Sequence, residues 1–217
     1  LPYVTRILGP ENLGKVGLST ATIAFFIVLS AFGIPYYAVR EIARHRDDET
    51  KLKIVAGELF ILGIVTTLIS YSIFLVVLFA VPRYSADKPL FLISSTVLLL
   101  STTGVEWLYQ GTERFGYITL RTVLFNAAAL GGLFLFVKRP EDYYAYAALL
   151  ALSSGGADLL NFLLARKNIQ VRGFNFSSIL KHLRPVTVLF GMNLARGIYT
   201  NADSIFLGLL RGDYDVG

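Results

Sequence analysis

The sequence contains no cysteine, only two histidines and little charge. Charged residues make up 16% of the 217 residues, whereas a soluble domain carries about 25%. Without cysteine, neither a disulfide framework nor a thiolate metal site can form. His45 and His182 are both expected in basic loops, which argues against a histidine metal cluster. The sequence also has no P-loop, metal-ligand spacing or nucleophile motif, so we expect no metal and no cofactor.

Apolar residues are abundant, at 54% of the chain. Several apolar stretches reach the roughly 20 residues that a membrane-spanning helix needs. The sequence therefore predicts an all-α polytopic membrane protein. The formal net charge of +5 does not indicate nucleic-acid binding, because the basic residues fall in short loops between spans. We expect a fragment of a longer transporter, in which the last turns of one span at 1–7 precede spans at 16–39, 54–81, 90–108, 118–137, 143–165 and 185–210.

Lysine and arginine are distributed unequally between the two sides of these spans. The loops at 40–53, 109–122 and 166–184 hold five, two and five of them, whereas the loops at 5–15, 83–88 and 138–139 hold two each. Basic residues mark the cytoplasmic face of a membrane protein. The loops 40–53, 109–122 and 166–184 are therefore predicted to be cytoplasmic, in a multi-pass protein of the cell (inner or plasma) membrane.

The predicted span 185–210 carries an arginine in its middle. Arg196 lies roughly 17 Å along the helix from residue 185, near the centre of a hydrocarbon core about 30 Å thick. Asn193, Thr200 and Asp203 share its helical face. Ionisable groups at this depth usually face an aqueous cavity, so the stripe predicts one. The alternative is that Arg196 pairs with Asp203, or with an acid on a neighbouring helix, only to hold the bundle together.

A second polar group ends the span at 90–108. Thr102, Glu106 and Gln110 follow each other at four-residue spacing, so a continuous helix would place them on one face beside Tyr109. A carboxylate, an amide and aromatic rings at this position predict binding of a sugar or of a coupling proton. The alternative is an aromatic-belt role for Trp107, with Glu106 solvated at the membrane edge.

Three other charged residues lie near span ends. Arg40 follows a kink expected at Gly33 and Pro35; it could contact a phosphate or serve as a positive anchor, the interpretation that we favour. Arg121 either lines the cavity or extends to the cytoplasmic surface. Glu58 is interpreted as an interfacial charge.

The span at 143–165 carries a further polar stripe of Ser154, Asp158 and Asn161. The stripe could line the cavity. The adjacent Gly155-Gly156 pair permits close helix approach, so hydrogen bonding between helices is a competing interpretation.

Together these stretches resemble the polysaccharide flippase family (O-antigen and capsule type) of the multidrug/oligosaccharidyl-lipid/polysaccharide exporter superfamily. The resemblance spans the whole chain and is most specific at Gly104-Val105-Glu106-Trp107 with Tyr109-Gln110-Gly111. The other motifs are Leu8-Gly9-Pro10-Glu11 with Leu13-Gly14, Gly33-Ile34-Pro35 with Arg40-Glu41-Ile42-Ala43, and Tyr199 with Asp203 and Leu207-Gly208.

The resemblance implies a MATE-like transporter of two six-helix lobes around a cavity that opens alternately to each side. Residues 1–184 would form most of the N-terminal lobe, and residues 185–217 the first span and turn of the C-terminal lobe. The implied substrate is a polyprenyl-pyrophosphate-linked oligosaccharide, moved from the cytoplasmic to the outer leaflet for cell-surface polysaccharide biosynthesis. Because no bond is made or broken in this process, the resemblance implies transport and not enzymatic catalysis. Membrane lipid and the polysaccharide polymerase machinery are the implied partners.

Combining this substrate with the polar residues gives a hypothesis for their roles. The substrate-binding candidates are Arg196, Arg121, Arg40, Asn193, Tyr109 and Gln110. The ion-coupling candidates are Glu106, Asp158 and Asp203. Two alternatives stay open: a cation-coupled multidrug exporter, whose cavity should be net acidic, and a membrane scaffold subunit, whose polar stripes would serve helix association only.

Overall fold

The computed structural model describes residues 2–170 and 176–210, with the side chains at 176, 177, 193 and 197–210 outside this description. Within the described residues all regular secondary structure is helical. By length and composition, five helical stretches could cross a membrane: Pro2–Ala31, Glu49–Ala80, Lys88–Gly111, Phe115–Phe136 and Pro140–Asn168. The prediction of an all-α polytopic membrane protein is confirmed.

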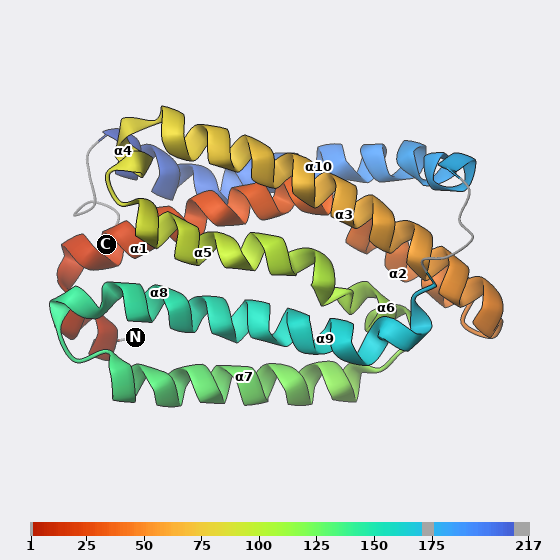
Figure 1. Ribbon diagram of the computed structural model, residues 1–217, viewed down its shortest axis with the longest axis horizontal. Coiled ribbons are helices and arrows are strands. Elements are labelled where there is room, and N and C mark those ends of the chain that lie inside the picture. Colours follow the sequence, from red (N-terminus) through yellow and green to blue (C-terminus); the bar gives the residue numbers. More distant parts are fainter. Residues whose placement is uncertain (1, 171–175, 211–217) are drawn as a thin grey trace.

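The long helices lie side by side along the long axis of the molecule (Figure 1). They are α1 (Pro2–Ala31), α3 (Glu49–Ala80), α5 (Lys88–Ser101), α7 (Phe115–Phe136), α8 (Tyr143–Ala151) continued by α9 (Ala157–Ala165), and α10 (Phe176–Leu210). The shorter elements are α2 (Ile34–Arg44), α4 (Pro82–Ser85), α6 (Glu106–Gly111), the 3-10 turns η1 (Thr102–Gly104), η2 (Pro140–Asp142) and η4 (Arg166–Asn168), and the π-helical turn η3 (Leu152–Gly156).

Two glycines with positive φ interrupt the first helices. Gly9 (φ 70°, ψ 168°) breaks α1, and Pro10 then restarts the helix, as a proline in a first turn can. Gly33 (φ 76°) separates α1 from α2, and Pro35 lies in the first turn of α2. The left-handed backbone at Gly33 suits glycine. The kink predicted at Gly33 and Pro35 is therefore confirmed as a break between two helices.

The loops predicted as cytoplasmic are shorter than expected. In the 40–53 segment, α2 continues to Arg44 and α3 begins at Glu49. Asp48 caps α3 by accepting a hydrogen bond from the backbone N–H of Lys51 (3.1 Å), and this bond lowers the pKa of its carboxyl. Likewise, α10 begins at Phe176, inside the expected 166–184 loop. The Asp48 cap thus starts α3 within the segment that its charge suggested to be a loop.

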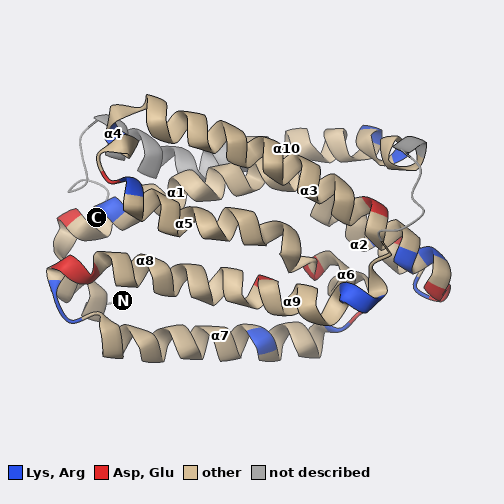
Figure 2. Ribbon diagram, viewed as in Figure 1, with Lys and Arg blue, Asp and Glu red and all other residues tan. Residues whose placement is uncertain are grey.

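The connections that the charge pattern predicted to be on one side of the membrane lie at the same end of the helix bundle. The turns that follow α2, α6 and α9 are at the same end of the bundle, and charged residues gather at its two ends (Figure 2). The described parts of the three loops predicted to share one side of the membrane therefore lie at one end of the molecule.

The predicted span 90–108 is not one continuous helix. It comprises α5, the 3-10 turn η1 and α6, and Val105 between η1 and α6 has a left-handed backbone (φ 34°). The prediction that Thr102 and Glu106 share one helical face is therefore wrong. A break at this point changes the direction of the side chains that follow it.

Helix α7 faces mainly outward. Its buried residues are Arg121, Gly132 and Leu133, and its exposed face carries Leu120, Val123, Leu124, Phe134, Leu135 and Phe136. An exposed apolar surface of this length suits contact with lipid. The buried Arg121 is therefore directed into the bundle.

The predicted span 185–210 lies within α10, which also includes Pro185. The predicted boundary between lobes, after residue 184, thus falls inside a helix, and the division at that point stays a prediction. Helix α10 packs against α1, α2 and α3.

Candidate functional site

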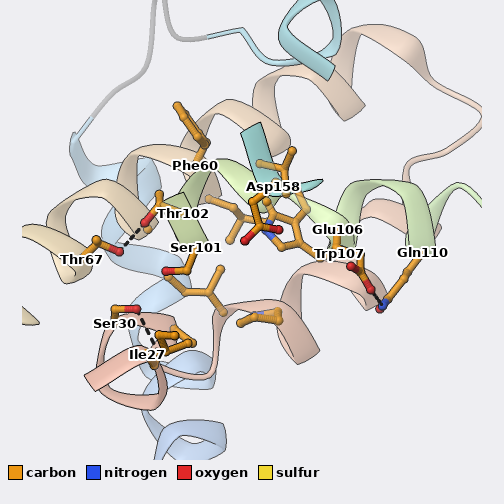
Figure 3. Close-up of a pocket in the computed structure, with 17 residues that line it drawn as sticks. Ile27, Ser30, Phe60, Thr67, Ser101, Thr102, Glu106, Trp107, Gln110 and Asp158 are labelled. Atoms are coloured by element: carbon orange, nitrogen blue, oxygen red, sulfur yellow. Dashed lines mark hydrogen bonds between the residues drawn. The ribbon is translucent and has the colours of Figure 1, made fainter. Parts of the chain in front are cut away.

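A cavity of about 250 Å³ lies inside the bundle near the end that holds α2 and α6. It is lined by residues of α1, α2, α3, η1, α6 and α9 and of the end of α5 (Figure 3). Its residues are Ile27, Ser30, Ala31, Ile34, Pro35, Leu59, Phe60, Gly63, Thr67, Ser101, Thr102, Gly104, Val105, Glu106, Trp107, Gln110 and Asp158. The α5–α6 interruption at Val105 lines the cavity, and Ala31 and Ile34, which flank the α1–α2 interruption, line it as well. Irregular backbone at membrane depth is tolerated where it is buried or lines a cavity.

One side of the cavity is lined by hydroxyl groups. The Thr67 and Thr102 hydroxyls are hydrogen-bonded to each other, and Ser101 lies beside them (Figure 3). Ser30 donates to the carbonyl oxygen of Ile27 (3.0 Å). These groups provide neutral hydrogen-bonding capacity between apolar walls.

The opposite side carries two carboxylates. Gln110 Nε2 donates to Glu106 Oε1 (3.0 Å), and Asp158 extends from α9 into the cavity (Figure 3). No hydrogen bond or ion pair joins Asp158 to any other residue that the structure describes. The charged residues lining the cavity are thus both acidic, although no group of three or more potential metal ligands occurs in the described part of the chain.

Arg121 forms an ion pair with Glu106 but is not among the residues that line the cavity. Its side chain is 5% exposed, and its Nη2 donates to Glu106 Oε2 (2.9 Å) and to Thr122 Oγ1 (3.3 Å). Its buried Nε and Nη1 have no hydrogen-bond partner among the described residues. Arg121 therefore pairs inward with Glu106 instead of extending to the surface, and it does not itself line the cavity.

Tyr109 has a structural contact instead of a place in the cavity wall. Its buried hydroxyl donates to the carbonyl oxygen of Asn161 (3.0 Å). Tyr117 donates to Asn161 Oδ1 (3.0 Å), and Asn161 Nδ2 donates to the carbonyl oxygen of Gly104 (2.6 Å). Asn161 thus satisfies the backbone at the break before α6 and holds α6, α7 and α9 together. In the 143–165 stripe, Asp158 lines the cavity while Asn161 bonds between helices.

The remaining predicted site residues lie elsewhere. Arg40 is largely exposed on α2, 5.5 Å from the Tyr37 ring and 3.9 Å from Glu41 Oε1. Arg196 is on the exposed face of α10 that also presents Val188 and Met192. The side chains of Asn193 and Asp203 lie outside the described residues. Of the nine predicted site residues, the cavity wall includes Glu106, Gln110 and Asp158.

The interpretation of Glu58 as an interfacial charge is wrong, as is the placement of His182 in a loop. Glu58 is 3% exposed and His182 is 2% exposed. His182 Nε2 lies 2.9 Å from Glu58 Oε2. The helix α10 begins early enough to bring His182 onto α3, which the basic composition of this segment did not indicate.

Sequence reasoning also missed Thr67, Ser101 and Ser30. Each is a hydroxyl residue in an otherwise apolar stretch. Such residues can satisfy a carbonyl oxygen within their own helix, so the sequence gives no sign of which ones face a cavity.

The apolar helices long enough to cross a membrane define the chain as part of a polytopic membrane protein, and they surround a cavity whose charged lining residues are acidic. Its family follows from comparison with known proteins. The family model "Polysaccharide biosynthesis protein" matches residues 1–217, and the chain belongs to that family.

Two curated proteins are similar to the chain over its whole length. The chain is 28% identical to a "Putative O-antigen transporter" of Shigella dysenteriae over 218 residues, covering all of this chain and 54% of the relative. It is 24% identical to a protein of the same name from Escherichia coli (strain K12) over 222 residues, covering all of this chain and 52% of the relative. The chain thus spans about half the length of these relatives. No solved structure matches it.

Proposed function

We propose that the full-length protein moves a polyprenyl-pyrophosphate-linked oligosaccharide from the cytoplasmic to the outer leaflet by alternating access. The observation that supports this most is the whole-chain match to a polysaccharide biosynthesis family, together with relatives named as O-antigen transporters. On this proposal no covalent bond is made or broken, and the protein is a transporter, not an enzyme. The product would supply cell-surface polysaccharide synthesis, with the polymerase machinery as a downstream partner.

The principal barrier to such transport is desolvation of the pyrophosphate. Moving an unpaired anion into a low-dielectric interior costs far more than a single hydrogen bond returns. Arg196 offers a charge-assisted, bidentate partner for phosphate oxygens. In a two-lobed transporter, the exposed face of α10 that carries Arg196 would face the second lobe. We therefore propose that Arg196 binds the pyrophosphate while the polyprenyl tail of the substrate stays in the bilayer.

The acidic cavity has a separate role in this proposal. Glu106 is partly compensated by Arg121, whereas Asp158 lines the cavity with no ion-pair partner in the described residues. A carboxylate in this setting can take up a proton or a monovalent cation. We assign ion coupling to Asp158, with Glu106 and Arg121 setting the charge beside it. The loops at 40–53, 109–122 and 166–184 would face the cytoplasm.

One observation favours a second candidate, a cation-coupled multidrug exporter. That class should have an acidic cavity, and the charged residues that line this cavity are Glu106 and Asp158. The family match favours the glycolipid. The two substrates differ in charge, so a direct transport assay separates them.

The test is translocation by the full-length protein in liposomes. Wild type should move a polyprenyl-pyrophosphate-linked oligosaccharide, and Arg196→Gln should lose most of that activity at matched protein levels. Lys167→Gln removes another exposed positive charge, outside the proposed path, and should transport like wild type. Movement of lipophilic cations without the glycolipid would instead support the multidrug function.

A further inference from the structure

A buried hydrogen-bonded chain of side chains connects α10 to α2 and α3, and none of its members is among the residues that line the cavity. The Tyr37 hydroxyl lies 2.8 Å from His182 Nδ1, and His182 Nε2 lies 2.9 Å from Glu58 Oε2. Lys181 Nζ lies 3.2 Å from the same carboxylate oxygen. Tyr37, His182 and Glu58 are 6%, 2% and 3% exposed. These three residues, one from each helix, therefore meet out of contact with solvent.

One tautomer of the neutral His182 ring matches the hydrogen-bonding roles of both partners. A carboxylate only accepts hydrogen bonds, so Nε2 carries the proton that goes to Glu58. In the neutral ring, Nδ1 then accepts the hydroxyl proton of Tyr37. The Lys181 ammonium balances the Glu58 charge. A neutral His182 thus satisfies both of its ring nitrogens and leaves the group without net charge.

Close backbone contacts surround this chain on both sides. A Cβ atom at Gly57 would overlap the carbonyl oxygen of Gln170, and the Gln170 N–H donates to the carbonyl oxygen of Lys53 (3.0 Å). A Cβ atom at Gly33 would lie 2.6 Å from the carbonyl oxygen of Val186. The glycines allow the chain leading into α10, and α10 itself, to lie directly on α3 and on the α1–α2 break. Each glycine therefore marks a point where two backbone segments are in close contact.

We propose that Tyr37, His182 and Glu58 form a latch that fixes the register of α10 against the bundle and must break before α10 can move. Apolar packing alone tolerates small sliding, but this chain is satisfied at one register only. Moving α10 by one helical turn, about 5.4 Å, would leave a buried carboxylate without its histidine. That penalty makes the contact two-state, as a switching element requires. The latch goes beyond the proposed function and does not depend on which substrate is carried.

The test measures the fraction of molecules in which α10 has moved away from α1, α2 and α3, which we call the open population. A single cysteine replaces Val186, which is fully buried beside Gly33, in the full-length protein with any other cysteines removed. Its reaction with a water-soluble maleimide in detergent reports the open population, because the buried thiol reacts only after opening. Val137→Cys, equally buried in another cluster with Val4, Leu8 and Leu133, serves as the control thiol.

Tyr37→Phe keeps the ring and removes only the hydroxyl, so labelling at position 186 should rise roughly fivefold, the factor that corresponds to one hydrogen bond. His182→Phe should raise labelling at position 186 further. The double variant should match His182→Phe, because both changes break the same series of hydrogen bonds. Two control variants, Tyr36→Phe at an exposed neighbouring tyrosine and His45→Phe, should leave labelling at position 186 unchanged.

Equal labelling at position 186 in Tyr37→Phe and Tyr36→Phe would overturn the latch. The same holds if labelling at position 137 rises as much as labelling at position 186, because the variants would then loosen the whole bundle. If His182→Phe does not fold, the Tyr37→Phe comparison decides the question alone.

Discussion

Neutralising Glu106 should destabilise the protein more than removing Glu106 and Arg121 together. Glu106→Gln leaves the Arg121 guanidinium buried without its carboxylate, while its Nε and Nη1 already have no hydrogen-bond partner among the described residues. In Glu106→Gln with Arg121→Met, the buried charge is gone and an apolar side chain of similar length replaces it. Breaking a buried pair is costly, whereas replacing both members is often neutral.

The magnitude depends on how exposed the pair is. Removing one member of a fully buried ion pair costs about 3–5 kcal/mol. The Glu106 side chain is 41% exposed and Arg121 is 5% exposed, so solvent screens part of the interaction. We expect the free energy of unfolding of the single variant to fall by about 1–3 kcal/mol. Its thermal unfolding midpoint should then be lower by several degrees.

The assay is thermal unfolding of the purified full-length protein in detergent, followed at one heating rate because such transitions are often irreversible. Gln110→Ala is the matched control, since it removes the other partner of Glu106 and leaves the ion pair intact. The reasoning fails if Glu106→Gln unfolds at the wild-type midpoint, or if the double variant is less stable than the single one.

Three other changes give sharp expectations in the same thermal assay. Gly57→Ala should destabilise the protein because the added Cβ would overlap the Gln170 carbonyl oxygen. Gly116→Ala, where the added Cβ meets open space, should be neutral or stabilising by up to about 1 kcal/mol. The same change in the unfolding midpoint at both positions would contradict this prediction. Asn161→Ala removes the hydrogen bond to the Gly104 carbonyl and should cost about 1–3 kcal/mol; an unchanged midpoint would show that the break before α6 does not need it. Asp158→Asn removes a carboxylate without an ion-pair partner in the described residues, so it should keep or raise the midpoint while reducing transport; a lower midpoint would indicate a structural partner.

The helical architecture was predictable because long apolar runs have few alternatives in a membrane protein. The kink at Gly33 and Pro35 was predictable as well, since both residues restrict the backbone in known ways. The break at Val105 was not. A β-branched residue with φ 34° carries no local signal, and the hydrogen bond from Asn161, 57 residues away in the sequence, satisfies the backbone there.

The cavity could be predicted only in part. Glu106, Gln110 and Asp158 stand out because polar groups inside membrane spans are costly. The same argument could not separate Arg121, which lies behind the cavity wall, from residues that form it. His182 and Glu58 were missed because they meet only through tertiary packing, 124 residues apart in the sequence.

The most direct test of the account asks whether the glycolipid reaches the face of α10 that carries Arg196. A single cysteine replaces Met192, which lies on that exposed face, and is labelled with a water-soluble maleimide in the full-length protein reconstituted in liposomes. Val76→Cys, on an exposed apolar face of α3, is the control for reaction at the lipid surface. The account predicts that a polyprenyl-pyrophosphate-linked oligosaccharide slows labelling at position 192 and not at position 76. Unchanged labelling at position 192 under saturating glycolipid, or protection by a lipophilic cation alone, would contradict it.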